Sequence, residues 1–158
     1  MSSSRLSPLF ALGASLAYMI RADGETMTEE RAKFLTVFGK QVTSGQMTAE
    51  QLQALTAAHA IPVNTLGAPF TVTTGRRLRE QGWPEGVDTA VVMLDGECSF
   101  RTLAADHYDI WWGAYLGMAE ERLVSGPLAE VAGEIVETRA KARAEHGWIM
   151  DIYLLRRR

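Results

Sequence analysis

Two Asp-Gly-Glu triplets constrain what this chain can fold into more than any other feature of its sequence. The first, Asp23-Gly24-Glu25, ends an apolar run and is followed by a segment that starts with Thr28-Glu29-Glu30. The second, Asp95-Gly96-Glu97, again follows apolar residues and lies 72 positions later (95 − 23 = 72). Glycine gives the backbone the freedom that a tight turn needs, and acidic residues favour the first turn of a helix. The triplets therefore predict two helix–turn–helix units.

Apolar residues recur at helical spacing along most of the remaining chain. Capping-box spacings at 26–29 and 48–51 indicate helix starts, and Ser125-Gly126-Pro127 indicates a stop followed by a restart. Residues 70–74 have strand propensity, but we assign their neighbourhood to a short helix ending at Gln81-Gly82, because no partner strand is evident. Further helices are expected over 83–94, 99–124, 128–146 and 148–155. The sequence predicts an all-α, single-domain bundle of about seven or eight helices.

Three segments are expected along that single domain. Residues 1–7 form a flexible N-terminus, residues 8–102 a helical core, and residues 103–158 a C-terminal helical extension packed on the same domain. The apolar run 9–20 is interpreted as a buried first helix, with a secretion signal as the alternative. This run is shorter than the roughly 20 residues that a membrane-spanning helix needs.

The unit around Asp23-Gly24-Glu25, with Glu30 shortly after it and a second Asp-Gly-Glu at 95–97, resembles the TerB-like (tellurite-resistance) family. It is also similar to the helical domain of membrane-anchored DnaJ-like co-chaperones. The likeness covers about residues 9–99. It implies two Asp-Gly helical units packed in one all-α bundle, with a divalent cation at the acidic positions.

A cation site follows from this resemblance, with Ca²⁺ or Mg²⁺ as the expected ion. The candidate ligands are Asp23, Glu25, Glu30, Asp95 and Glu97. An EF-hand is excluded, because placing Gly24 at loop position 6 puts Met19 and Arg21 at two positions that must coordinate the ion. The alternative is structural: the aspartate stabilises the turn, and the glutamates that follow it cap a helix.

Trp111 and Trp112 suggest a second class of function. Adjacent positions of a helix differ by about 100°, so both indoles are not expected in one core pocket, and tryptophan is enriched at interfaces. With Tyr115 nearby, these residues predict a contact surface for a partner protein or for a second copy of the chain. The alternative is a broad core that accepts both rings.

Motifs of catalysis and nucleotide binding are absent from the sequence. It contains no G-x-S-x-G, P-loop or G-x-G-x-x-G. Its one cysteine, Cys98, has no base near it in sequence. We therefore predict a protein that is not an enzyme. The formal net charge of −3 argues against a nucleic-acid partner. A single cysteine fits a cytoplasmic location. The arginines at 156–158 leave open a peripheral contact with the inner face of the membrane.

Together these observations predict a non-enzymatic, TerB-like module that binds or senses a ligand in stress and tellurite resistance. Its Asp-Gly turn is expected to hold the cation, and its helical surface to contact a partner protein. The alternative is a helical adaptor or accessory subunit of a larger complex, without a metal. That alternative rests on Trp111-Trp112 and on the residues beyond 103.

Overall fold

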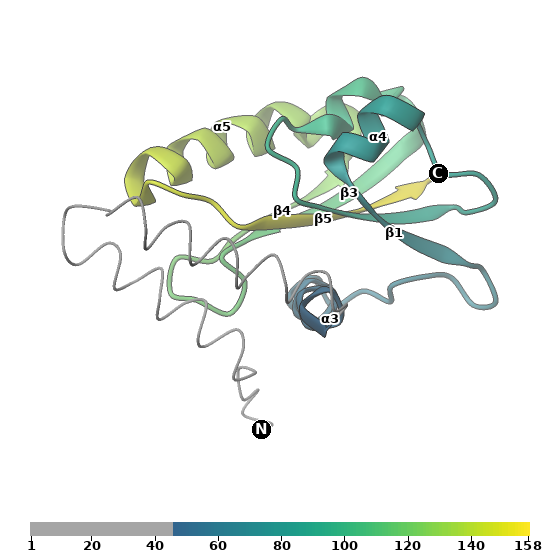
Figure 1. The fold of residues 1–158 in the computed structure, drawn as a ribbon, viewed down its shortest axis with the longest axis horizontal. Coiled ribbons are helices and arrows are strands. Elements are labelled where there is room, and N and C mark those ends of the chain that lie inside the picture. Colours follow the sequence, from purple (N-terminus) through teal and green to yellow (C-terminus); the bar gives the residue numbers. More distant parts are fainter. Residues whose placement is uncertain (1–45) are drawn as a thin grey trace. The chain divides into compact units, whose positions relative to one another are not determined.

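The computed structural model describes residues 46–158 of the chain, of which Leu52–Arg158 form one compact unit. This unit is a mixed α/β fold built on a single sheet (Figure 1). The elements in chain order are α3 (Gln46–His59), β1 (Phe70–Thr74), α4 (Gly75–Gln81), β2 (Thr89–Met93), the 3-10 turns η1 (Ser99–Thr102) and η2 (Ala105–His107), β3 (Tyr108–Ala114), β4 (Arg122–Pro127), α5 (Leu128–His146) and β5 (Asp151–Arg157).

The sheet has five strands in the order β1-β2-β5-β3-β4. Strands β1 and β2 run parallel, and the β1–α4–β2 crossover supplies the connection that a parallel pair requires. All other neighbours are antiparallel, and β5, the last strand in sequence, enters the centre of the sheet between β2 and β3. Strand β5 therefore joins the β1–β2 pair to the β3–β4 pair in one sheet.

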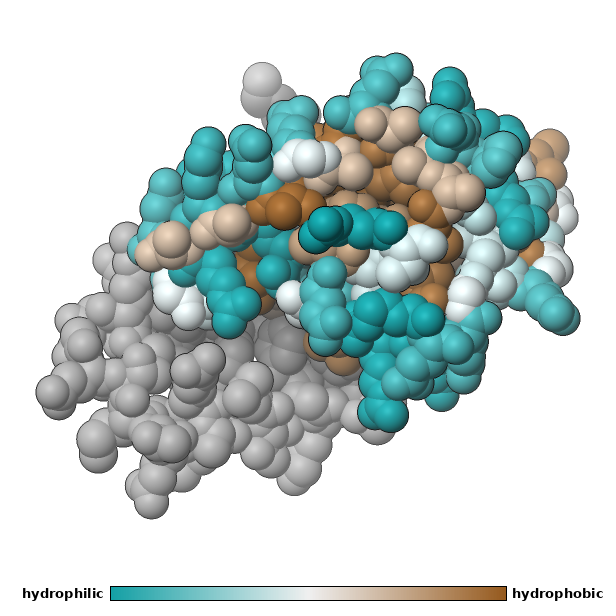
Figure 2. Space-filling model, turned by 90° about the horizontal axis from the view of Figure 1, so that it is seen from above, coloured by the Kyte–Doolittle hydropathy of each residue, from teal (hydrophilic) through white to brown (hydrophobic). Residues whose placement is uncertain are grey.

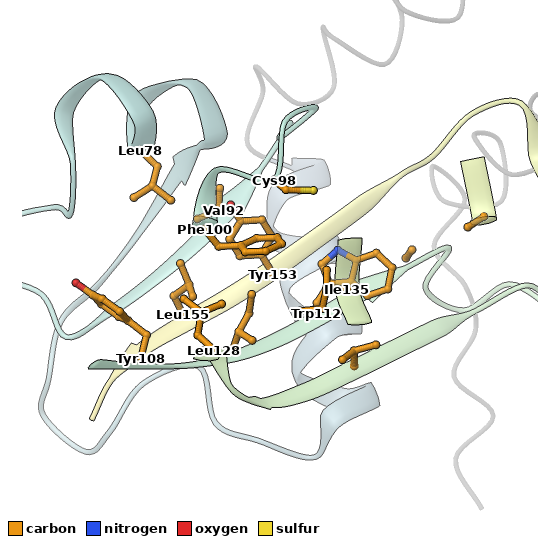
Figure 3. Close-up of a cluster of buried hydrophobic side chains, with 14 of the residues drawn as sticks. Leu78, Val92, Cys98, Phe100, Tyr108, Trp112, Leu128, Ile135, Tyr153 and Leu155 are labelled. Carbon is orange, nitrogen blue, oxygen red and sulfur yellow. The ribbon is translucent and has the colours of Figure 1, made fainter. Parts of the chain in front are cut away.

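Helices α4 and α5 lie together on one face of the sheet (Figure 1). Polar residues predominate on the outside of this layer, with apolar residues visible between them (Figure 2). Beneath it, Phe100 from η1 and Tyr153 from β5 meet edge to face, with ring centroids 5.3 Å apart (Figure 3). Leu78 of α4 and Ile135 of α5 pack into the same core. On the other face of the sheet, Leu55 lies close to Gly113.

The all-α prediction is wrong. The described residues contain three α-helices and five strands, whereas the prediction was a bundle of seven or eight helices without a sheet. The expected helix over 83–94 holds β2, and the expected helix over 148–155 lies largely in β5. All five residues of β2 are buried. A strand buried on both faces reads as a continuous apolar run, which periodicity does not distinguish from a buried helix.

The expected helix over 99–124 is also wrong. This stretch contains η1, η2, β3 and the start of β4. Residues 70–74 form the strand that their propensity favoured, because β2, taken for a helix, is the partner strand. The predicted helix at 128–146 is confirmed as α5, and the helix end at Gln81-Gly82 is confirmed as the end of α4.

No helix among residues 46–158 combines the length and the apolar composition needed to cross a bilayer.

Candidate functional site

The second Asp-Gly-Glu triplet forms a tight turn at the end of β2, and the carboxylate of Asp95 organises it from inside. One oxygen, Oδ2, accepts hydrogen bonds from the Tyr153 hydroxyl at 2.6 Å and from the Ser99 amide at 2.5 Å. The other oxygen, Oδ1, accepts from the Ser99 hydroxyl at 2.7 Å and from the Glu97 amide at 3.2 Å. Asp95 is buried. The carboxylate thus ties the turn to itself and to β5.

Helix α4 contributes the guanidinium of Arg79 to this cluster, and its first residue lies close to the Asp95 carboxylate. Arg79 Nη1 lies 2.7 Å from Ser99 Oγ and 3.4 Å from Asp95 Oδ1, and its Nη2 lies 3.3 Å from Glu97 Oε1. The first residue of α4 is Gly75, and a Cβ atom there would stand 2.3 Å from Asp95 Cγ. Only glycine therefore allows α4 to begin this close to the Asp95 side chain.

A second carboxylate, whose side chain is only 9% exposed, lies at the same end of the sheet. Asp151, the first residue of β5, accepts at Oδ2 from Trp112 Nε1 at 2.9 Å and from Arg139 Nε at 3.1 Å. Arg139 also donates through Nη2 to the Asp95 carbonyl at 3.2 Å. Its guanidinium therefore links α5 to both the β2 turn and the start of β5. Such buried charges are tolerated only when they are paired and hydrogen-bonded.

The surroundings shift the pKa values of Asp95, Asp151 and Tyr153 in different directions. Burial opposes ionisation of Asp95, but its hydrogen bonds from Tyr153, Ser99 and Glu97 outweigh burial and lower the pKa of this carboxyl. Burial raises the pKa of Asp151, although Arg139 and Trp112 counteract the rise. Burial, and then the negative charge of Asp95, raise the pKa of the Tyr153 hydroxyl well above its ordinary value. Tyr153 therefore acts as a donor toward ionised Asp95.

Three non-glycine residues at this end of the sheet adopt left-handed backbone conformations. Leu94 and Cys98 flank the turn with φ of +52° and +54°, and Tyr115, directly after β3, has φ of +51°. The Tyr115 hydroxyl donates to the Trp148 carbonyl at 2.6 Å, and burial raises its pKa to about 12. Backbone strain of this kind concentrates at functional sites.

Pairing within the sheet brings these segments together at one end of the three central strands. Met93 pairs with Ile152 and Ala114 pairs with Asp151, so the ends of β2 and β3 flank the start of β5. The Leu94 side chain is 56% exposed there, and space is open around Gly96. Both carboxylates are held by donors, and burial raises the pKa of the Cys98 thiol. The arrangement therefore suits the positioning of a ligand against a rigid turn better than proton transfer.

The structure places only part of the predicted cation site. Asp23, Glu25 and Glu30 lie outside the described residues. Asp95 and Glu97 belong to one turn, where Asp95 is buried among its donors and Glu97 is exposed and paired with Arg79. Between residues 46 and 158, no group of three or more His, Cys, Asp or Glu side chains is arranged to hold a metal ion. Binding of Ca²⁺ or Mg²⁺ stays a prediction.

The predicted contact residues lie on a strand. Trp112 and Tyr115 are fully buried in the core between the sheet and its helices. Trp111 is half-buried, and the Arg156 guanidinium stands 5.2 Å from the centroid of its ring. Adjacent strand residues point to opposite faces, so the two indoles belong to different layers. A role of these residues toward a partner stays a prediction.

The terminal arginines are engaged within the fold. Arg156 donates to the Thr89 hydroxyl at 3.2 Å and to the Pro62 carbonyl at 2.8 Å. Arg157 stands 5.2 Å from the centroid of the Trp83 ring, and Arg158 lies 3.4 Å from Asp109. A peripheral membrane contact through them stays a prediction.

Sequence reasoning missed the partners of Asp95. Arg79, Arg139 and Tyr153 lie 16, 44 and 58 positions from it, on three different elements. One local signal was present, because an aspartate followed by serine four residues later suits a turn that the side chain closes. A second was Asp151, a lone acid inside an apolar run.

The chain is similar to proteins of cobalamin synthesis. No protein-family model matches it. It is 57% identical over 106 residues to a precorrin-6A synthase (deacetylating) from Sinorhizobium sp., which covers 67% of this chain and 40% of that enzyme. The resemblance to the TerB-like family is wrong. The chain spans well under half the length of this curated relative.

A solved structure agrees with this similarity. A putative cobalamin-synthesis-related protein (CobF) from Corynebacterium diphtheriae superposes with a TM-score of 0.61 at 41% identity, over 66% of this chain and 44% of that protein. The similarity to a named enzyme overturns the prediction of a non-enzymatic module, and with it the link to tellurite resistance. The Asp-Gly-Glu triplet misled because the same turn residues serve at the end of a strand as well as between helices.

Proposed function

We propose that this chain forms part of a cobalamin-synthesis enzyme that makes precorrin-6A with loss of an acetyl group. The identity of 57% over 106 residues to precorrin-6A synthase carries the proposal. At least 55 of the matched residues lie in the Leu52–Arg158 unit, because residues 1–51 accommodate no more than 51 of them (106 − 51 = 55). The similarity to CobF in both sequence and fold supports the same assignment.

The role we assign to this unit is positioning. The turn at 94–99 is held rigid from inside by Asp95 and presents an exposed leucine and open space at Gly96. A preorganised turn at a sheet edge orients a ligand at little entropic cost. The matched residues cover 40% of the relative, and we assign the groups that react to the part of the relative that this chain does not match.

A chimera tests the proposal. The segment of the Sinorhizobium enzyme that aligns with this chain is replaced by this chain's own sequence, and formation of precorrin-6A and release of the acetyl group are measured. We expect activity within about tenfold of the parent enzyme. The same junctions carrying the corresponding CobF segment serve as the control. A chimera that folds but makes no precorrin-6A, beside an active CobF chimera, would sink the proposal.

The positioning role has its own test in the active chimera. Leu94→Ala removes the exposed side chain at the strained turn, and Leu66→Ala makes the same change at a fully exposed leucine of the connector before β1. We expect Leu94→Ala to raise KM at least tenfold with an unchanged melting temperature, and Leu66→Ala to alter neither. Equal kinetics in the two variants would remove the turn from the ligand site while leaving the enzyme assignment intact.

A further inference from the structure

The Arg79 guanidinium has partners of two kinds, inside the fold and at its surface. On the inside, Nη1 donates to Ser99 Oγ at 2.7 Å and lies 3.4 Å from Asp95 Oδ1, in a side chain that is 2% exposed. On the outside, Nη2 lies 3.3 Å from Oε1 of Glu97, whose side chain is 69% exposed. The Arg79 side chain itself is 28% exposed. Buried groups therefore fix the guanidinium, and its outer partner is a carboxylate in solvent.

The outer carboxylate marks a place where a small anion fits. A guanidinium presents a planar array of donors that matches the two oxygens of a carboxylate. The last CH₂ group of Glu97 and its carboxylate have the composition of acetate, less one hydrogen. Because an ion pair with so exposed a partner contributes little to stability, Glu97 leaves Arg79 at little cost. An acetate-sized ligand then takes the place of the Glu97 carboxylate.

The charges around the turn favour an anion once Glu97 has moved away. Burial raises the pKa of the Cys98 thiol in this turn, and the positive charges of Arg139 and Arg101 counteract the rise. Three guanidinium groups and three carboxylates lie around the turn: Arg79, Arg101, Arg139, Asp95, Glu97 and Asp151. Donors within the fold hold the two aspartates. Displacement of Glu97 therefore leaves three positive charges beside two negative ones.

The backbone of the turn offers a second donor at the surface. The Asp95 carbonyl accepts a hydrogen bond from Arg139 Nη2 at 3.2 Å. The C=O and N–H groups of one trans peptide point in opposite directions, so the Gly96 N–H is directed away from Arg139. Within residues 46–158 this N–H has no hydrogen-bond partner, and the space beside Gly96 is open. The turn thus presents an unused N–H donor next to the residue that pairs with Arg79.

We propose that Arg79 Nη2 and the Gly96 N–H bind a small carboxylate in place of Glu97, and that in the enzyme this carboxylate is acetate. The choice of acetate rests on the proposed function, in which an acetyl group is lost. When the acetyl group passes to water, the bond between its carbonyl carbon and the precursor breaks. Water supplies the hydroxyl that completes acetic acid and the hydrogen that the precursor takes up, and the acid then ionises to acetate. The site holds this product at the turn.

A titration of the full chain with sodium acetate at neutral pH tests the binding site. Nuclear magnetic resonance follows the Gly96 amide and the Arg79 Nε–H group, and sodium chloride at equal ionic strength gives the background. We expect saturable shifts with acetate alone. Glu97→Gln removes the competing carboxylate and should lower the Kd for acetate by about threefold. Arg79→Gln removes the charged donor and should raise it by about tenfold or more.

The same helix offers a matched control pair. Arg76 Nε lies 2.9 Å from Glu80 Oε1, with side chains 77% and 56% exposed. Arg76→Gln and Glu80→Gln should leave the Kd for acetate unchanged. Circular dichroism checks that each variant folds, and Glu97→Gln, at an exposed position, decides the result if Arg79→Gln does not fold. The absence of a saturable shift, or an affinity that Glu97→Gln fails to raise, overturns the proposal.

Product inhibition in the active chimera tests the choice of acetate. Sodium acetate should inhibit formation of precorrin-6A. The Glu97→Gln chimera should be inhibited at about threefold lower acetate concentration, and the Glu80→Gln chimera at the same concentration as its parent. Inhibition that Glu97→Gln does not change would overturn acetate as the product bound here, with the enzyme assignment intact. An inactive chimera would count against the enzyme assignment, and the titration of the full chain would still decide whether the site binds a carboxylate.

Discussion

The Tyr153 hydroxyl donates a hydrogen bond of 2.6 Å to Asp95 Oδ2 across 58 positions of the chain. This bond joins the central strand β5 to the turn that ends β2. In the same position Asp95 also reaches Ser99 and Arg79. The bond therefore transmits the rigidity of the core to an exposed segment at the sheet edge.

Removing this hydroxyl should destabilise the fold. Tyr153→Phe keeps the ring against Phe100 but leaves buried Asp95 with one donor fewer, so we expect a loss of about 1–3 kcal/mol in the free energy of unfolding. Urea denaturation measures it. Tyr108→Phe, in a tyrosine that stacks on Trp83 outside this network, provides the control. A loss no larger than the control's would mean that the hydroxyl contributes nothing to stability.

Two glycine-to-alanine changes should act in opposite directions. Gly75→Ala introduces a Cβ 2.3 Å from the Asp95 carboxyl carbon and should cost about 1–3 kcal/mol. Gly133→Ala, inside α5 with open space around the new Cβ, should stabilise by about 0.5–1 kcal/mol. Thermal melts of the two variants decide between them. Stabilisation by Gly75→Ala would contradict the close approach of α4 to Asp95.

Acid should weaken the fold through Asp95. Burial raises the pKa of this carboxyl, but the hydrogen bonds from Tyr153, Ser99 and Glu97 outweigh it and hold the folded-state pKa below its ordinary value. The stability that ionisation of Asp95 contributes is therefore fully present above that ordinary value. It is lost as the pH falls through the folded-state pKa. Asp95→Asn should therefore cost most at pH 7 and progressively less below about pH 4. Urea titrations of both proteins from pH 2 to 7 measure this, and a difference that is constant with pH refutes it.

Ionisation of Asp151 should affect stability in the opposite direction from ionisation of Asp95. Burial raises its folded-state pKa above the unfolded value, so ionisation of this group costs stability as the pH rises between those two values. At neutral pH the carboxylate depends on Arg139, whose side chain is 11% exposed. Arg139→Gln should therefore destabilise by about 3–5 kcal/mol.

The control for that variant is an exposed ion pair between strand β4 and helix α5. Arg122 lies 3.9 Å from Glu145 with both side chains in solvent, so Arg122→Gln should change the free energy of unfolding by no more than about 1 kcal/mol. Similar losses in Arg139→Gln and Arg122→Gln, measured by urea denaturation at pH 7, would show that the Arg139–Asp151 pair has no special weight.

Local signals were enough for some elements. Helix α5 follows from Pro127 at its start, acidic residues early, basic residues late and Gly147 at its end, all of which act within one turn of the chain. The turn at Asp95-Gly96 was likewise expected from its residues. The nature of the segments that enter and leave it was not.

The sequence by itself determined where the backbone turns and where a helix with its own caps begins and ends, because those preferences are local. Only the tertiary structure decided that residues 89–93 and 151–157 are strands, since an apolar run is satisfied equally by burial in a helix or between two layers. It also decided that Asp95 meets Tyr153, Arg79 and Arg139. Sheet pairing and buried charge networks join distant residues, and no local spacing records them.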